Sequence, residues 1–406
     1  MKIAKPAAHG FDAGRLAAID GFLKERYVES GKLPNTQLLI ARDGEVVHFA
    51  HDGAAREGGG PVDETSLFRI ASMTKPITSV AFMMLVEEGK VAVDTPVHHV
   101  LPELKGVGVY NGGGAGVPFA TRPTSEPMRM VDLLRHTSGL TYGFQNRSNI
   151  DAAYREGKIE NWHGGLDLQG FVAALGELPL EFSPGEGWNY SVSTDVLGAV
   201  VERVSGETLD VFFRKRIFAP LKMDDTFFQV PADKIDRLTD CYTFVAGKGR
   251  VMYDRGEASA WSRAPRLLSG GGGLVSTALD YHRFATMCLN GGELDGARIL
   301  GRKTLELMTR NHLPGGSDLA TMSQSLFSEA ANAGTGFGLG FAVNLDVAKS
   351  MVPGSVGEYY WGGMFSTAFF IDPVERITMV FMTQMSPSNV YPIRRELKTM
   401  IYAALT

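Results

Sequence analysis

The pattern of apolar and polar positions predicts a helix and two strands near the start of the chain. Residues 11–29 have a pattern typical of a helix that opens the fold. Residues 36–53 follow as two apolar runs joined at Asp43-Gly44. Asp-Gly between such runs is a strong signal for a β-hairpin, so we expect two antiparallel strands here.

The middle of the chain, from about residue 91 to 275, has a mostly helical pattern with long irregular segments. Residues 194–206 form a short amphipathic run ending at Gly206, which predicts a helix with glycine at its C-terminal end. The segments 104–127 and 311–337 are too long to be simple connectors. Loops of that length in compact domains are often lids or binding loops, so we expect both to shape a pocket.

The last part of the chain returns to strands. Short apolar runs between residues 337 and 385 predict them, with a turn at Asp372-Pro373 between the last two. Residues 391–404 predict a closing helix.

Strands near both ends with helices between them predict an α/β (α+β) protein. The simplest topology pairs the terminal strands in one antiparallel sheet with helices packed on it. Residues 1–90 and 276–406 are then expected to form the subdomain with the sheet, and residues 91–275 an inserted, mostly helical subdomain. A seam between two such parts is a usual location for an active site.

Composition narrows the class of protein. The chain has 406 residues of which 44% are hydrophobic, which is enough for a sizeable core, and its formal charge of −5 provides no basic surface for nucleic acid. No apolar run reaches the about 18 residues that a membrane span needs, and no apolar stretch of the secretory type follows Lys2 and Lys5. Cys241 and Cys288 fit neither a metal motif nor a disulfide framework. We therefore expect the protein to be located in the reducing cytoplasm.

Candidate chemistry begins in the apolar stretch FRIASMTKPITSVAFMMLVEEG, residues 68–89. Pro76 is tolerated in the first turn of a helix, so the helix is expected to begin near Ser72. Lys75 then lies one turn further on the same face, within reach of the serine hydroxyl. The helix dipole and the apolar surroundings disfavour a charged lysine and favour the neutral amine that can accept a proton. Alone, the S-x-x-K motif is weak, because an N-cap serine with a lysine at the rim also explains it.

Four further motifs follow S-x-x-K along the chain. The five, in order, are SMTK (72–75), LLRHTSGL (133–140), GWNYSVSTDVLG (187–198), SGGGGLVSTALDYHRF (269–284) and YYWGGMFSTAFF (359–370). This series resembles the class C β-lactamase-like hydrolases over nearly the whole chain. It is most similar to the branch of family VIII carboxylesterases, which includes simvastatin-synthase-type acyltransferases. The resemblance implies a β-lactamase/transpeptidase-like fold.

The resemblance also implies catalytic roles. Ser72 matches the nucleophile, Lys75 its activating partner, and Tyr190 the tyrosine of the second motif. A neighbouring cationic lysine favours a phenolate that can take the serine proton and pass it to a leaving alcohol. The backbone N–H groups of Ser72 and Met364 are expected to form the oxyanion hole.

Two departures from the β-lactamase pattern change the expected substrate. Val192 stands where β-lactamases have an asparagine that holds a substrate amide, and an apolar group cannot make that hydrogen bond. Trp361, Gly362 and Gly363 stand where β-lactamases have Lys-Thr-Gly, so an indole replaces the lysine that attracts a carboxylate. The two glycines permit close backbone approach. We therefore expect all four positions to contact an uncharged ester.

Several other residues have predicted positions near the site. Tyr142, Phe144 and Tyr110 are candidates to line the acyl pocket. His136 is expected to be a buried, hydrogen-bonded histidine rather than the partner of a nucleophilic serine. Asp195 is expected to cap or orient the helix that follows Tyr190.

The sequence as a whole predicts a cytoplasmic serine carboxylesterase that hydrolyses uncharged short- to medium-chain esters through an acyl-enzyme on Ser72. An acyltransferase of the same fold, with weak β-lactamase activity, is the alternative, and a non-catalytic scaffold is a distant one. The absence of G-x-S-x-G argues against an α/β-hydrolase, and the absence of H-E-x-x-H, paired cysteines and a phosphate loop implies no metal or other cofactor. The expected partner is a small-molecule ester, with no nucleic acid and no membrane; the sequence sets no oligomeric state.

Overall fold

The computed structural model describes residues 2–324 and 333–406. Residues 325–332, part of the second long loop expected at 311–337, lie outside the described residues. Within the described part of that loop, a short helix, α11 (Leu319–Met322), precedes the strand at Thr335.

Seven antiparallel strands form the central sheet, in the order β11-β12-β13-β14-β15-β1-β2. Their bounds are β1 (Asn35–Arg42), β2 (Glu45–Gly53), β11 (Thr335–Phe337), β12 (Ala342–Asn344), β13 (Tyr359–Gly362), β14 (Ala368–Asp372) and β15 (Ile377–Met382). Asp43 and Gly44 both have positive φ, as a two-residue turn that matches the strand twist requires. Because β1 pairs with β15, the two ends of the chain share one sheet, which confirms the predicted topology.

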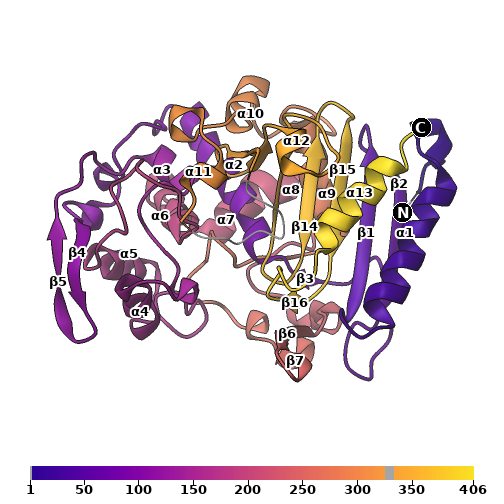
Figure 1. Cartoon of the computed structure of the whole chain (residues 1–406), viewed down its shortest axis with the longest axis horizontal. Coiled ribbons are helices and arrows are strands. Elements are labelled where there is room, and N and C mark those ends of the chain that lie inside the picture. The colour runs from indigo at the N-terminus through magenta and orange to yellow at the C-terminus, as the bar shows by residue number, and fades with distance from the viewer. Residues whose placement is uncertain (1, 325–332) are drawn as a thin grey trace.

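Helices cover both faces of this sheet, as Figure 1 shows. Alternate residues of β1 enter different cores: Leu38 and Ile40 pack with α1 (Ala13–Leu23) and α13 (Ile393–Ala403), while Leu39 packs with α9 (Ala278–Leu289). Side chains of a strand alternate between the two faces, so a strand buried on both sides is apolar throughout. This explains why the terminal strands appear in the sequence as continuous apolar runs.

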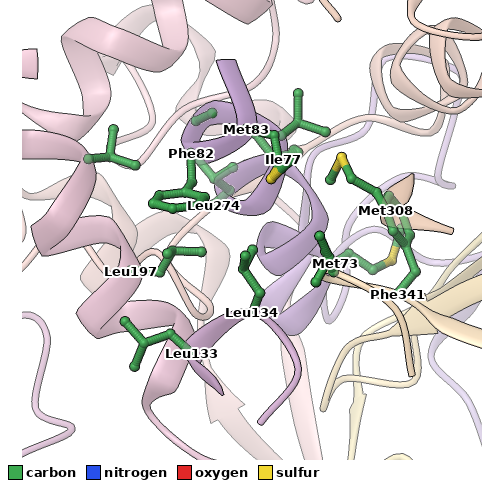
Figure 2. Close-up of a cluster of buried hydrophobic side chains, with 14 of the residues drawn as sticks. Met73, Ile77, Phe82, Met83, Leu133, Leu134, Leu197, Leu274, Met308 and Phe341 are labelled. Atoms are coloured by element: carbon green, nitrogen blue, oxygen red, sulfur yellow. The ribbon is translucent and has the colours of Figure 1, made fainter. Parts of the chain in front are cut away.

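A single apolar helix, α2 (Thr74–Glu87), lies at the centre of the largest core. Figure 2 shows Ile77, Phe82 and Met83 of α2 among side chains from several other segments. The other residues labelled in the figure are Met73, Leu133, Leu134, Leu197, Leu274, Met308 and Phe341. A helix that is surrounded by protein is apolar on all sides, which accounts for the composition of this stretch.

The middle of the chain contains short helices and two hairpins. The helices are α3 (Met130–Leu134), α4 (Asn149–Glu156), α5 (Leu168–Gly176), α6 (Ser193–Ser205), α7 (Leu209–Phe213) and α8 (Ala219–Leu221), and the hairpins are β4 (Val109–Gly114) with β5 (Val117–Arg122) and β6 (Cys241–Val245) with β7 (Gly249–Asp254). Helix α6 packs against α2 and ends at Gly206, whose φ of 73° is the left-handed C-cap that the sequence predicts.

The expectation of an irregular lid at 104–127 is wrong, because most of this segment is the hairpin β4–β5. The glycines of this segment suggest a loop in the sequence, but they lie where the pairing of β4 with β5 shifts register twice. A Cβ on Gly113 would overlap the carbonyl of Pro118 in the opposite strand. The Tyr110 hydroxyl donates to the Gly113 carbonyl at 3.1 Å, so this tyrosine holds the hairpin together rather than lining an acyl pocket.

Candidate active site

Ser72 lies in a tight turn between a short strand and the central helix. Strand β3 (Phe68–Arg69) leads into a 3-10 turn, Ala71–Met73, and α2 begins at Thr74. Ala71 has a φ of 45°, a conformation that a residue with a side chain adopts only at a cost of about 1–3 kcal/mol. The helix therefore begins two residues after Ser72, and the strained turn holds the serine at the helix mouth.

The ammonium group of Lys75 is surrounded by three acceptors. Nζ lies 3.1 Å from Ser72 Oγ, 3.0 Å from Tyr142 Oη and 2.6 Å from the Gly271 carbonyl oxygen. The side chain is only 2% exposed. These three oxygens match in number the three N–H bonds of an ammonium, and they hold Nζ beside Ser72.

Tyr190 completes a group of three around the serine. Its hydroxyl oxygen lies 2.5 Å from Ser72 Oγ, and Lys75 Nζ lies 4.6 Å from the centre of its ring. Gln145 donates a hydrogen bond to the Tyr190 carbonyl, which fixes the backbone just before α6. The structure thus brings Ser72, Lys75 and Tyr190 together, although 118 positions separate the serine from the tyrosine.

The buried carboxylate of Asp195 supports the residues around Ser72. Asp195, in the first turn of α6, accepts hydrogen bonds from Ser269 Oγ, from the Gly271 N–H at 3.1 Å and from Tyr142 Oη at 3.4 Å. Burial raises the pKa of Asp195, while the charge of Lys75 and these donors oppose the rise. The sequence predicted that Asp195 caps or orients the helix after Tyr190, but α6 has no side-chain cap. The carboxylate instead fixes the turn whose carbonyl holds Lys75.

Gly271 offers a test of this support. A Cβ at this position would overlap the Asp195 carboxylate, so we expect Gly271→Ala to displace the carbonyl that holds Lys75. The expected loss is about 1–3 kcal/mol in the free energy of unfolding and about 10- to 100-fold in kcat/KM. Chemical denaturation and ester hydrolysis measure the two effects. The matched control is Gly21→Ala in α1, where nothing lies within 4 Å, and a gain of about 0.5–1 kcal/mol is expected there.

The Trp-Gly-Gly segment ends β13 beside the serine turn. A Cβ on Gly363 would lie 2.5 Å from the carbonyl oxygen of Ile70, so glycine is needed for this close approach. A Cβ on Gly362 would lie 2.6 Å from the guanidinium carbon of Arg394. Met364 follows in the next turn with a side chain 42% exposed. Its N–H as an oxyanion donor stays a prediction.

Aromatic rings surround Tyr190. The ring centre of Trp361 lies 5.5 Å from that of Tyr190, and Tyr142 stacks on Phe144 at 4.7 Å. Phe144 is 47% exposed, whereas the Tyr142 hydroxyl touches Lys75, so these two predicted pocket residues have different surroundings. Val192 is 1% exposed and packs in the core at the start of α6, so it adds no polar group to the site.

His136 is buried and does not face a nucleophile. Its Nδ1 lies 3.3 Å from Ser191 Oγ, and its ring packs against Tyr190 at 4.9 Å. Burial, together with the charge of Lys75, holds the pKa of the imidazole well below its ordinary value. The Ser138 hydroxyl instead forms a hydrogen bond with the Ser193 hydroxyl, with 2.7 Å between the two Oγ atoms. The predicted structural role of His136 is confirmed.

The described residues contain neither a metal-binding cluster nor a membrane-spanning helix. No group of three or more histidine, cysteine, aspartate or glutamate side chains there could hold a metal ion. Among the same residues, no helix has the length and apolarity to cross a membrane. Cys241 and Cys288 are both buried and unpaired.

Comparison with known proteins gives the family. The family model described as beta-lactamase matches residues 22–403. Protein Rv1367c of Mycobacterium tuberculosis is 36% identical over 82% of this chain and 80% of its own length, and esterase EstB of Burkholderia gladioli is 31% identical over 98% of both chains. The solved structure of EstCE1, described as a hydrolase with promiscuous acyltransferase activity, is 26% identical with a TM-score of 0.79, and covers 96% of this chain and 98% of its own. The chain therefore belongs to the beta-lactamase family and has the β-lactamase/transpeptidase-like fold.

Proposed function

We propose that this protein is a serine carboxylesterase that acts through an acyl-enzyme on Ser72. The observation that carries the proposal is the position of Ser72 Oγ, 3.1 Å from Lys75 Nζ and 2.5 Å from Tyr190 Oη. The names of its relatives, an esterase and a hydrolase with acyltransferase activity, support the same reaction class.

Acylation begins when Ser72 Oγ attacks the carbonyl carbon of the ester. The serine proton passes to the Tyr190 oxygen, whose phenolate form the neighbouring Lys75 ammonium stabilises. The carbonyl oxygen becomes an oxyanion that the N–H groups of Ser72 and Met364 hold in the proposed mechanism. When the bond to the alcohol oxygen breaks, Tyr190 returns the proton to that oxygen and the alcohol leaves.

Deacylation repeats these steps with water. Tyr190 takes a proton from water, the hydroxide attacks the acyl carbon, and the proton returns to Ser72 Oγ as the acid leaves. Lys75 and Tyr190 act as a coupled pair in both halves of the reaction. We also propose that the site forms at a seam, with Ser72 and Lys75 from the subdomain of residues 1–90 and 276–406, and Tyr190 from that of residues 91–275.

The proposed substrate is an uncharged ester of short to medium chain length. Trp361 packs on Tyr190 at the position where β-lactamases have a lysine, so an aromatic surface replaces an anion site. Hydrolysis of p-nitrophenyl butyrate, followed at 405 nm with natively folded protein, tests the function. Turnover well above the blank is expected; no turnover across a panel of acetyl to octanoyl esters would rule out the proposal.

Acyl transfer is the second candidate. The solved structure described as a hydrolase with promiscuous acyltransferase activity supports it. Adding an alcohol or amine acceptor to the butyrate assay measures the partition of the acyl-enzyme. Butyryl transfer that exceeds hydrolysis at millimolar acceptor would make the protein an acyltransferase.

We expect β-lactam hydrolysis to be slow. Val192 is buried, and position 361 carries an indole. The asparagine and the lysine with which β-lactamases hold a substrate amide and carboxylate are thus replaced by apolar side chains. Cleavage of a chromogenic cephalosporin is expected at a kcat/KM at least about 10³-fold below that for p-nitrophenyl butyrate. Comparable values for the two substrates would contradict the roles given to Val192 and Trp361.

The cytoplasm is the proposed location, because neither cysteine is in a disulfide, as is usual in a reducing compartment. The non-catalytic scaffold has no support from the site, since Ser72, Lys75 and Tyr190 are all present.

A further inference from the structure

A short loop, residues 142–145, contacts both partners of Ser72. Its first residue places a hydroxyl 3.0 Å from Lys75 Nζ, and its last, Gln145, donates to the carbonyl of Tyr190. The position of this loop therefore sets how Lys75 and Tyr190 are held around the serine oxygen. Residues of α4 and of the turn after it hold the loop itself.

The peptide groups of Gly143 are bound on both sides by one neighbouring segment. The Gly143 N–H donates to Glu160 Oε1, and the Gly143 carbonyl accepts from Arg155 Nη1. A Cβ on Gly143 would lie 2.9 Å from Arg155 Cγ and 3.3 Å from Glu160 Oε1, so the backbone fits closely between the two side chains. Arg155 belongs to α4 and Glu160 to the turn that follows it.

The same helix also holds the residue before the loop. Asp151 of α4 accepts a hydrogen bond from Thr141 Oγ1 at 2.7 Å, and it closes the N-terminal cap of α4 by accepting from the backbone N–H of Ser148. Helix α4 and the turn after it thus hold the loop, with Arg155 reaching it from the helix and Glu160 from the turn. Of these contacts, only the one from Glu160 joins a carboxylate to the backbone N–H next to Tyr142.

We propose that Glu160 is a positioning residue of the active site, which fixes Tyr142 against Lys75 by binding the Gly143 N–H and makes this positioning depend on pH. The proposal rests on the proposed esterase function. Glu160 touches no reacting atom; it acts through Gly143 and Tyr142. The contact is strongest when Glu160 is ionised, because a hydrogen bond to a carboxylate is about twice as strong as one to a neutral group.

The charges around Glu160 set the pH range. Burial raises the pKa of Glu160 to about 7; the Gly143 N–H and Arg155 oppose the rise, while Asp195 of α6 and Asp151 of α4 add to it. Glu160 also interacts electrostatically with Tyr142 and Tyr154. Above pH 7 the carboxylate holds the loop, and below pH 7 the contact weakens.

Folding stability changes with pH in the opposite direction to the contact between Glu160 and the loop. The ordinary pKa of a glutamate is 4.5, so raising it in the folded protein makes Glu160 contribute most to stability below pH 4.5. This contribution is lost as pH rises through about 7. Ionised Glu160 therefore improves positioning while it reduces folding stability, as expected of a partly buried charge kept at a functional site.

Glu160→Gln tests the proposal, because it keeps the size and an acceptor oxygen but removes the ionisation. We would measure kcat/KM for p-nitrophenyl butyrate from pH 5.5 to 9 in wild type and variant, and take the ratio at each pH. The expected ratio of wild type to variant is about 3–10 at pH 8.5 and near 1 at pH 6, mainly through kcat.

The matched control is Glu156→Gln, an exposed glutamate of α4, with an expected ratio of 1 at every pH. The melting temperature of Glu160→Gln at pH 8 is expected to equal or exceed that of wild type. A ratio that does not change with pH, or a variant that is less stable at pH 8, would overturn the proposal. Because wild-type activity is measured in the same experiment, failure of the esterase function itself would be seen separately, as absence of turnover in wild type.

Discussion

Ser72→Ala is expected to lower kcat/KM for p-nitrophenyl butyrate by at least about 10⁴-fold, because removal of a nucleophile abolishes the acyl-enzyme route. The structure predicts little change in folding, since among the described residues the hydroxyl bonds only Lys75 and Tyr190, and neither becomes isolated. Lys75 keeps its contacts to Tyr142 and the Gly271 carbonyl. Initial rates with a thermal unfolding curve for each protein provide the measurement.

Ser138→Ala is the control for this substitution. Ser138 is a buried serine close to a histidine in the sequence, but its hydroxyl bonds Ser193 and not His136. The variant is expected to lose stability while keeping kcat/KM within about threefold of wild type when folded. If Ser72→Ala kept more than a tenth of the activity and Ser138→Ala lost it, the nucleophile would be misassigned.

Lys75→Met is expected to lower kcat/KM by about 10³-fold, at the upper part of the range for a group that assists proton transfer. Methionine has a similar length and suits the buried position, but it provides no N–H for Ser72 and no positive charge beside Tyr190. The Gly271 carbonyl loses its partner, at a cost of about 1–3 kcal/mol, which the removal of a buried charge partly offsets. Folding is therefore expected to survive.

A double variant tests whether Lys75 and Tyr190 act as one unit. Tyr190→Phe alone removes the oxygen that lies 2.5 Å from Ser72 Oγ, and a loss of similar size is expected. The double variant is then expected to lose little more than either single one, because groups that act together are not additive. Losses that multiply would indicate independent roles and contradict the coupled pair.

Much of the fold was predictable because its signals are local. The Asp43-Gly44 turn, the apolar terminal strands and the glycine at the end of α6 each depend on a few neighbouring residues. The spacing of Ser72 and Lys75 likewise fixes their proximity once a helix is assumed. The hairpin at 109–122 was missed, because Gly112 to Gly114 look like a loop unless the opposite strand is known.

The support of the site was less predictable, because it depends on contacts between distant segments. The Gly271 carbonyl that accepts from Lys75 is a backbone atom and leaves no side-chain signal in the sequence. Tyr142 was expected to line a pocket, since an aromatic residue gives no indication that its hydroxyl meets a lysine. Glu160 has an ordinary sequence context, and only its partial burial beside Gly143 makes it distinctive.

The most direct test of the account is to label the native protein with a p-nitrophenyl phosphonate and locate the adduct by intact-mass and peptide mass spectrometry. The account predicts one phosphonyl group per chain, on Ser72, formed much more slowly when Lys75 or Tyr190 is replaced. An adduct on another residue, or full esterase activity with Ser72 unmodified after complete labelling, would contradict it.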